Sequence, residues 1–134
     1  MNLRFRIGQR YYTRPNQKIN VGSKFPEILT SWRWAIPNVF GSKADFLTGS
    51  ITLSDRINFK RLGRAFWSAR AGMFFSNKNM SLMDYKHFNG NQTIFSDFEN
   101  FKFQLLDYYL YSTNDKYAEA IYNHNFRGFI INKL

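Results

Sequence analysis

The 134-residue sequence has no cysteine, only three prolines and no long apolar run. Without cysteine, these residues form no disulfide, no thiol nucleophile and no cysteine-ligated zinc site. No window of about 18 apolar residues exists, which excludes a transmembrane helix. Membrane-spanning strands are not excluded, because their alternating pattern gives a much weaker hydropathy signal.

Acidic residues are scarce in the first half of the chain. Residues 1–70 contain 13 lysines and arginines against three carboxylates, whereas residues 71–134 contain six of each sign. The whole formal charge of +10 therefore lies in the first half. Such a basic half indicates either an anionic partner or solvated loops and the polar interior of a barrel, and we favour the second interpretation.

What the sequence has in abundance is aromatic residues, with 15 Phe, 8 Tyr and 3 Trp. Trp32 and Trp34 fall on the same side of an alternating run. This placement is typical of an aromatic girdle at a membrane interface. An ordinary aromatic core gives the same pattern, so this run alone does not decide between them.

Four runs in the first 75 residues alternate with the period of two that is typical of strands. They span residues 3–11, 28–36, 46–57 and 64–75. The third run is the clearest, because Leu47, Gly49, Ile51 and Leu53 face one way while Thr48, Ser50, Thr52 and Ser54 face the other. Aliphatic side chains opposite small hydroxyls suit a strand between lipid and a barrel interior, and also an ordinary half-buried sheet.

The last third of the chain is organised by turn signals and one long run. Asn89-Gly90 and Asn114-Asp115 predict turns, as Pro15-Asn16 does earlier. Strand formers then continue from Lys116 to Ile131, longer than the five or six residues of a typical strand and long enough for a membrane strand of about nine to eleven. Ser-x-x-Glu at 96–99 allows a short helix near 96–108, although we favour a strand there.

These patterns together predict an all-β antiparallel meander of about six or seven long strands in a single domain, residues 1–134. We expect Lys116 to Gly128 to form one strand, with Glu119 on one face and Ala120 on the more apolar face. If the apolar face meets lipid, Ala120→Arg should cost about 2–4 kcal/mol, whereas Glu119→Leu should be tolerated.

No constellation of residues points to catalysis. The two histidines, His87 and His124, lack the spacing of a metal motif and would need Asp84 or Glu119 from elsewhere. There is no Gly-x-Ser-x-Gly and no glycine-rich phosphate loop. We therefore expect no enzyme activity, no metal and no cofactor.

Several short motifs in residues 87–134 carry a resemblance to a known family. They are His87 with Gly90-Asn91-Gln92-Thr93, Phe103 to Tyr109, Asn114-Asp115-Lys116-Tyr117-Ala118, His124-Asn125-Phe126-Arg127-Gly128 and Asn132-Lys133-Leu134. In order and spacing they resemble the C-terminal barrel region of a family of outer-membrane proteins of Bacteroidota, DUF5686, which place a carboxypeptidase-regulatory-like domain before a β-barrel. Gly22-Ser23-Lys24-Phe25-Pro26 is a looser upstream match. The chain departs from the family at Asn114, where Ser is usual, and near Leu110, where an acidic residue is usual.

The resemblance implies family-motif residues but no role for them. These are His87, Gly90, Asn91, Asp115, Tyr117, His124 and Gly128. It also implies part of a β-barrel in the cell outer membrane, with a structural, transport or assembly role. Its partners would be outer-membrane lipid, lipopolysaccharide and the remaining strands of a longer parent chain, since the first 20 residues contain no signal-peptide h-region.

The main alternative is a soluble β domain that binds nucleic acid or another polyanion. Basic residues alternate with aromatic ones near the start of the chain, namely Arg4, Phe5, Arg6, Arg10, Tyr11, Tyr12, Arg14 and Lys18. Stacking aromatics beside a basic groove is how single strands are bound without sequence preference. No established nucleic-acid motif is present, so we expect nucleic acid to be an unlikely partner.

Overall fold

The computed structural model describes residues 1–39, 41–92 and 102–126. This part of the chain contains nine strands and two short 3₁₀ turns. The strands are β1 (Asn2–Phe5), β2 (Gln9–Arg14), β3 (Gln17–Ser23), β4 (Glu27–Ala35), β5 (Asp45–Asn58), β6 (Arg64–Asn79), β7 (Gly90–Asn91), β8 (Phe103–Gln104) and β9 (Lys116–Asn125). The 3₁₀ turns are η1 (Lys60–Leu62) and η2 (Leu82–Asp84). The predicted all-β class is confirmed.

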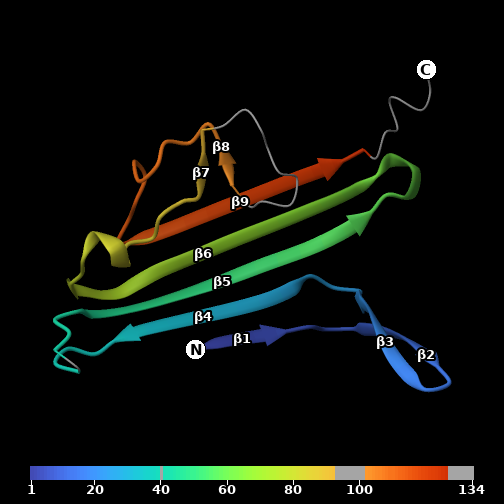
Figure 1. Ribbon diagram of the computed structural model, residues 1–134, viewed down its shortest axis with the longest axis horizontal. Coiled ribbons are helices and arrows are strands. Elements are labelled where there is room, and N and C mark those ends of the chain that lie inside the picture. Colours follow the sequence, from blue (N-terminus) through green and yellow to red (C-terminus); the bar gives the residue numbers. More distant parts are fainter. Residues whose placement is uncertain (40, 93–101, 127–134) are drawn as a thin grey trace.

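Five strands form the main sheet in the order β1-β4-β5-β6-β9, with every neighbour antiparallel. Figure 1 shows them side by side, with the β2–β3 hairpin extending past one end of β1 and β4. The central strands are long, with 14 residues in β5 and 16 in β6. β4, β5 and β6 are consecutive neighbours, whereas the β2–β3 hairpin intervenes between β1 and β4 and a longer segment intervenes between β6 and β9. The sheet is therefore an antiparallel meander with two longer connections.

The single strand predicted over residues 3–11 is wrong. β1 ends at Phe5 and pairs with β4, whereas β2 begins at Gln9 and pairs with β3. Gly8 separates them with a φ of 68°, a left-handed conformation that glycine adopts without steric cost. The backbone N–H of Lys24 donates to the Gly8 carbonyl at 3.1 Å. This bond joins the link between β1 and β2 to the link between β3 and β4.

Two turn predictions had different outcomes. Pro15 and Asn16 do form the two-residue turn between β2 and β3, whose ends pair as Arg14 with Gln17. Asn89-Gly90 does not form a hairpin turn, because Gly90 lies in β7 and pairs in parallel with Phe103 of β8. A Cβ on Gly90 would lie 2.3 Å from the Leu106 carbonyl oxygen, so glycine is needed here for close backbone approach rather than for a turn.

The helix considered for residues 96–108 is absent from its described part, residues 102–108. Phe103 and Gln104 form the short strand β8, and Leu105 follows with a φ of 63°, which ends it. The favoured strand is therefore found, but with only two residues. Residues 93–101 lie outside the described residues.

The prediction for the final strand is confirmed over most of its length. Asn114 and Asp115 form a bend, and β9 then runs without interruption from Lys116 to Asn125. Phe126 lies beyond its end, so the strand is shorter than predicted on the C-terminal side. Gly128 lies outside the described residues.

The two faces of the sheet differ in polarity and in exposure, and the more polar face is the more buried one. On β5, Thr48 and Thr52 are only 4% and 7% exposed, whereas Ile51 and Leu53 on the opposite face are 53% and 38% exposed. We call the side with Thr48, Thr52, Arg70 and Glu119 the polar face, and the side with Ile51, Leu53, Ala71 and Ala120 the apolar face. Residues 81–92 and 102–113, which we call the covering segment, pack on the polar face and leave the apolar face uncovered.

Candidate functional site

Three charged side chains meet on the polar face. Arg70 of β6 and Glu119 of β9 are directly paired across the two strands. Arg70 Nη1 lies 3.0 Å from Glu119 Oε1, and Lys86 Nζ, from the segment after η2, lies 3.1 Å from Glu119 Oε2. Arg70 Nε also donates to Thr52 Oγ1 at 2.9 Å. We call Arg70, Lys86 and Glu119 the charged triad.

Two members of the triad are well shielded from solvent, whereas the side chain of Arg70 is 38% exposed. The side chain of Glu119 is 10% exposed and that of Lys86 is 14% exposed. A shielded charge is tolerated when it is paired and hydrogen-bonded, and removing one partner leaves an uncompensated charge. The triad therefore ties the segment that contains Lys86 to two strands of the sheet.

Tyr117 of β9 contacts the segment that contains Lys86 and Phe88. It stands opposite Gly72 on β6, and a Cβ on Gly72 would lie 2.5 Å from the Tyr117 hydroxyl oxygen. Phe88 meets the Tyr117 ring edge-on at 6.3 Å, and Lys86 Nζ lies 5.4 Å from the ring centroid. Gly72 thus leaves the space in which Tyr117 supports both residues.

His87 and Asp115 fasten the two ends of the same segment. His87 Nδ1 lies 2.6 Å from Ser112 Oγ, and its ring meets Tyr109 edge-on at 5.0 Å. The backbones of Lys86 and Thr113 exchange two hydrogen bonds of 2.8 and 3.0 Å. The Asp115 carbonyl accepts from the Phe74 N–H at 2.9 Å, at the point where the chain enters β9.

His124 lies apart from these residues, on the apolar face. Its Nε2 donates to the Leu62 carbonyl at 2.9 Å, since a carbonyl can only accept. Its ring lies against Phe59 and Phe126, with centroids 5.7 and 4.3 Å away. The two histidines therefore contact different parts of the fold. No group of three His, Cys, Asp or Glu residues that could hold a metal occurs in the described ranges.

Five of the seven family-motif residues thus lie in or against the covering segment. His87, Gly90 and Asn91 belong to it, and Asp115 and Tyr117 anchor its return to the sheet. His124 is on the other face, and Gly128 is outside the described residues. The sequence did not single out Arg70 or Lys86, and the only signal for the triad was one glutamate in the middle of an apolar strand.

Two hollows lie between the covering segment and the polar face. The larger has a volume of about 560 Å³ and is lined by Arg33, Arg70, Lys86 and His87, among others. The smaller, of about 290 Å³, is lined by Thr52, Glu119 and Phe103, among others. Arg70 borders both, so the charged triad separates them.

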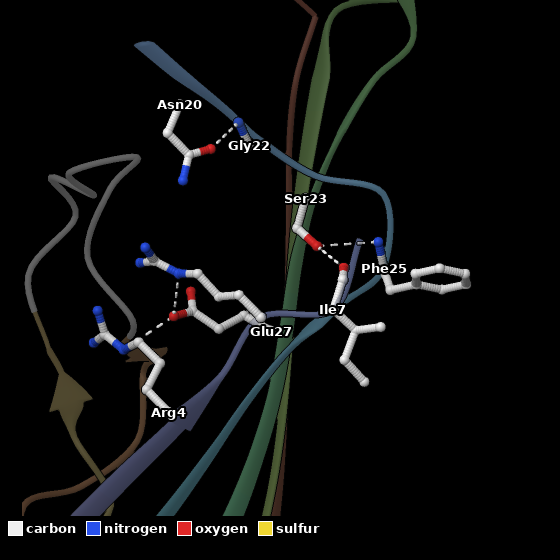
Figure 2. A network of polar contacts seen from close by, with 8 residues as sticks. Arg4, Ile7, Asn20, Gly22, Ser23, Phe25 and Glu27 are labelled. Carbon is white, nitrogen blue, oxygen red and sulfur yellow. Dashed lines mark hydrogen bonds and ion pairs between the residues drawn. The ribbon is translucent and has the colours of Figure 1, made fainter. Parts of the chain in front are cut away.

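A second polar network closes the end of β1 and β4 near the hairpin (Figure 2). Glu27 Oε1 accepts from Arg4 Nε at 2.9 Å and from Arg6 Nε at 3.0 Å. Ser23 Oγ donates to the Ile7 carbonyl and accepts from the Phe25 N–H at 3.3 Å. Two of the arginines expected in a basic stripe, Arg4 and Arg6, therefore share the single carboxylate of Glu27.

The fold and site define an all-β protein whose sheet shields its polar face beneath its own chain and exposes its apolar face. The family model for the C-terminal domain of a family of unknown function, DUF5686, matches residues 1–134. The chain belongs to this family. No curated protein and no solved structure matched the sequence. In the part of the chain that the structure describes, no helix has the length and hydrophobicity to cross a membrane.

Proposed function

We propose that this domain is the C-terminal part of an outer-membrane β-barrel with a structural, transport or assembly role and no catalytic activity. The observation that supports the proposal is the reversed polarity of the sheet. An antiparallel sheet with one face in water buries its apolar face and exposes its polar one. A barrel wall in a membrane does the opposite, with apolar side chains toward lipid and polar ones toward the interior.

The aromatic side chains of the apolar face agree with this proposal. Trp34 is 72% exposed, and Trp32 stacks on Phe75 with ring centroids 5.8 Å apart. Trp and Tyr concentrate where barrel strands cross the membrane–water interface. In water, so many exposed aromatic and aliphatic side chains would form an aggregation-prone patch.

Strand length and sheet edges support the same conclusion. β4, β5, β6 and β9 have 9, 14, 16 and 10 residues, and crossing a bilayer takes about nine to eleven. β1 and β9 each have a neighbour on one side only within the described sheet. Open edges are not tolerated in lipid, and barrels have at least about eight strands. We propose that the remaining strands of the parent barrel pair with these two edges.

The β2–β3 hairpin suits contact with the anionic outer-membrane surface. It carries Arg10, Arg14 and Lys18 and no carboxylate. Tyr11 and Tyr12 are exposed beside them, and Lys18 Nζ lies 5.3 Å from the Tyr11 ring centroid. We propose that lipopolysaccharide phosphates and lipid headgroups are its partners. The same composition favours the second candidate function, polyanion binding by a soluble domain.

Neighbouring residues of β5 give a direct test in the full-length protein in lipid bilayers. Ile51→Cys and Thr52→Cys place single spin labels on opposite faces, because this domain has no cysteine and any elsewhere can be replaced. We expect the label at 51 to be accessible to oxygen dissolved in lipid, and the label at 52 to be inaccessible to it. Equal oxygen access at both sites, or a folded, monodisperse monomer in buffer without detergent, contradicts the proposal.

A further inference from the structure

The larger hollow on the polar face is rich in positive charge. Arg33 of β4, Arg70 of β6 and Lys86 line it together with His87, and none of the described residues that line it is an aspartate or glutamate. From this geometry we propose that the hollow binds a small hydroxyl-bearing solute that carries an oxyanion, either phosphate or carboxylate.

The charges of the hollow are not balanced within the described structure. Glu119 pairs with Arg70 and Lys86 from the side of the smaller hollow. Three cations against this one carboxylate leave an excess of two positive charges. Arg33 is exposed and has no ion-pair or hydrogen-bond partner in the described parts of the chain. An excess of this kind in a concave, partly shielded site raises the local concentration of anions.

Arg33 is the residue best suited to bind the anion. A guanidinium group presents a planar fork of donors that matches phosphate and carboxylate oxygens in pairs. Arg70 is already held by Thr52 and Glu119, so it contributes charge from a fixed position. Lys86 is likewise held by Glu119.

The rest of the lining suits the neutral part of such a solute. Hydroxyl groups of Ser31, Ser50, Tyr85 and Tyr117 border the hollow. Its volume of about 560 Å³ lies within the range of small-molecule sites, about 300–1,000 Å³, and far exceeds the needs of a bare ion. A polar organic anion therefore fits better than an inorganic one.

This inference rests on the proposed function only for the route of entry. If the sheet is a barrel wall, the polar face borders the interior and a solute reaches the hollow from there. Binding itself depends only on the residues of the hollow.

The test is calorimetric titration of the full-length protein in detergent with glucose 6-phosphate, gluconate, glucose and inorganic phosphate. We expect the two organic anions to bind, inorganic phosphate to bind more weakly and glucose not to bind. Arg33→Gln should lower the affinity for glucose 6-phosphate about tenfold or more, the size expected for one charge-assisted hydrogen bond. Arg33→Lys should recover part of it, because the charge is kept while the fork is lost.

Arg10→Gln is the matched control, since it removes the same charge from the exposed hairpin. We expect it to change the affinity by less than about twofold, because screening weakens distant surface charges. Equal losses in Arg33→Gln and Arg10→Gln, binding of glucose as tight as that of its phosphate, or no binding of any anion overturns the proposal.

The spin-label measurement at positions 51 and 52 separates the two proposals. A lipid-facing label at 51 in a protein that binds no anion overturns the solute site alone. Anion binding by a protein that is monodisperse without detergent supports the solute site and overturns the proposed membrane function.

Discussion

The two faces of the main sheet differ in which side chains are buried and which are exposed. On the polar face, threonines are buried, Arg70 and Lys86 are paired with Glu119, and the covering segment packs over the strands. On the apolar face, Ile51 and Trp34 are open to the surroundings. Only Phe46, Ala65 and Phe74 are buried hydrophobic residues in the described structure, so a conventional apolar core does not hold it together. The covered side adds the ion pairs of Glu119 and the hydrogen bond between Arg70 and Thr52.

The strongest test of the covered face is Glu119→Leu. It leaves Arg70 and Lys86 facing each other without the carboxylate that joins them. Breaking a shielded ion pair by removing one partner costs about 3–5 kcal/mol, which we expect in urea unfolding of the full-length protein in bilayers. The sequence alone suggested tolerance, because it showed no partner for Glu119.

Glu27→Leu is the control for this prediction. Glu27 also joins two arginines, but its side chain is 30% exposed. Ion pairs near the surface contribute about 0–1 kcal/mol, so Glu27→Leu should cost much less. Similar losses at the two positions would show that the polar face is no better shielded than the end of the sheet.

The matching test of the apolar face is Ala120→Arg. Ala120 faces away from the covering segment and pairs with Ala69 of β6. An arginine on the lipid side near mid-membrane costs about 2–4 kcal/mol. The same unfolding measurement checks this, with Ala120→Leu as the size control that lipid should accept. A tolerated arginine would show that this face meets water.

The contact between Gly72 and Tyr117 is a smaller feature of the covered face. Gly72→Ala forces its new methyl group against the Tyr117 ring. Overpacking of this kind costs about 1–3 kcal/mol. In the double variant with Tyr117→Ala, the cost of the added methyl should largely disappear, and this coupling is measured by a double-mutant cycle. Additive losses would mean that Tyr117 does not support the covering segment through this contact.

The sequence predicted the strands of the main sheet better than the segment that packs on them. Period-two alternation placed β4, β5 and β6, and the Asn114-Asp115 bend placed the start of β9, because local pattern and turn chemistry decide these elements. The alternation predicted for β9 is also confirmed, because Glu119 and Ala120 lie on different faces of the sheet. Gly8 and Gly90 misled the prediction, because their roles depend on contacts with Lys24 and Leu106, far away in sequence.

The candidate site was beyond reach of the sequence for the same reason. Arg70 and Lys86 look like ordinary solvated charges until the covering segment packs against the sheet. Arg33 looks like one more member of a basic half, and only the hollow beside it distinguishes it from Arg10. Pairings between segments set these roles, and a single sequence without its partners does not reveal them.

The hairpin belongs to neither face, and its charges should matter least for stability. The exposed β2–β3 hairpin carries three cations, Arg10, Arg14 and Lys18. We expect replacement of each by Gln to change the unfolding free energy by at most about 0.5 kcal/mol. Each cation near an anionic membrane surface contributes about 1 kcal/mol of binding, so the triple variant should bind lipopolysaccharide vesicles more weakly. The difference from the parent protein should shrink at high ionic strength, because salt screens exposed charges. Flotation of the purified protein with such vesicles at low and high salt measures both effects. Tight binding to single-stranded DNA that persists at high salt and is lost in Tyr11→Ala would instead favour base stacking on the hairpin.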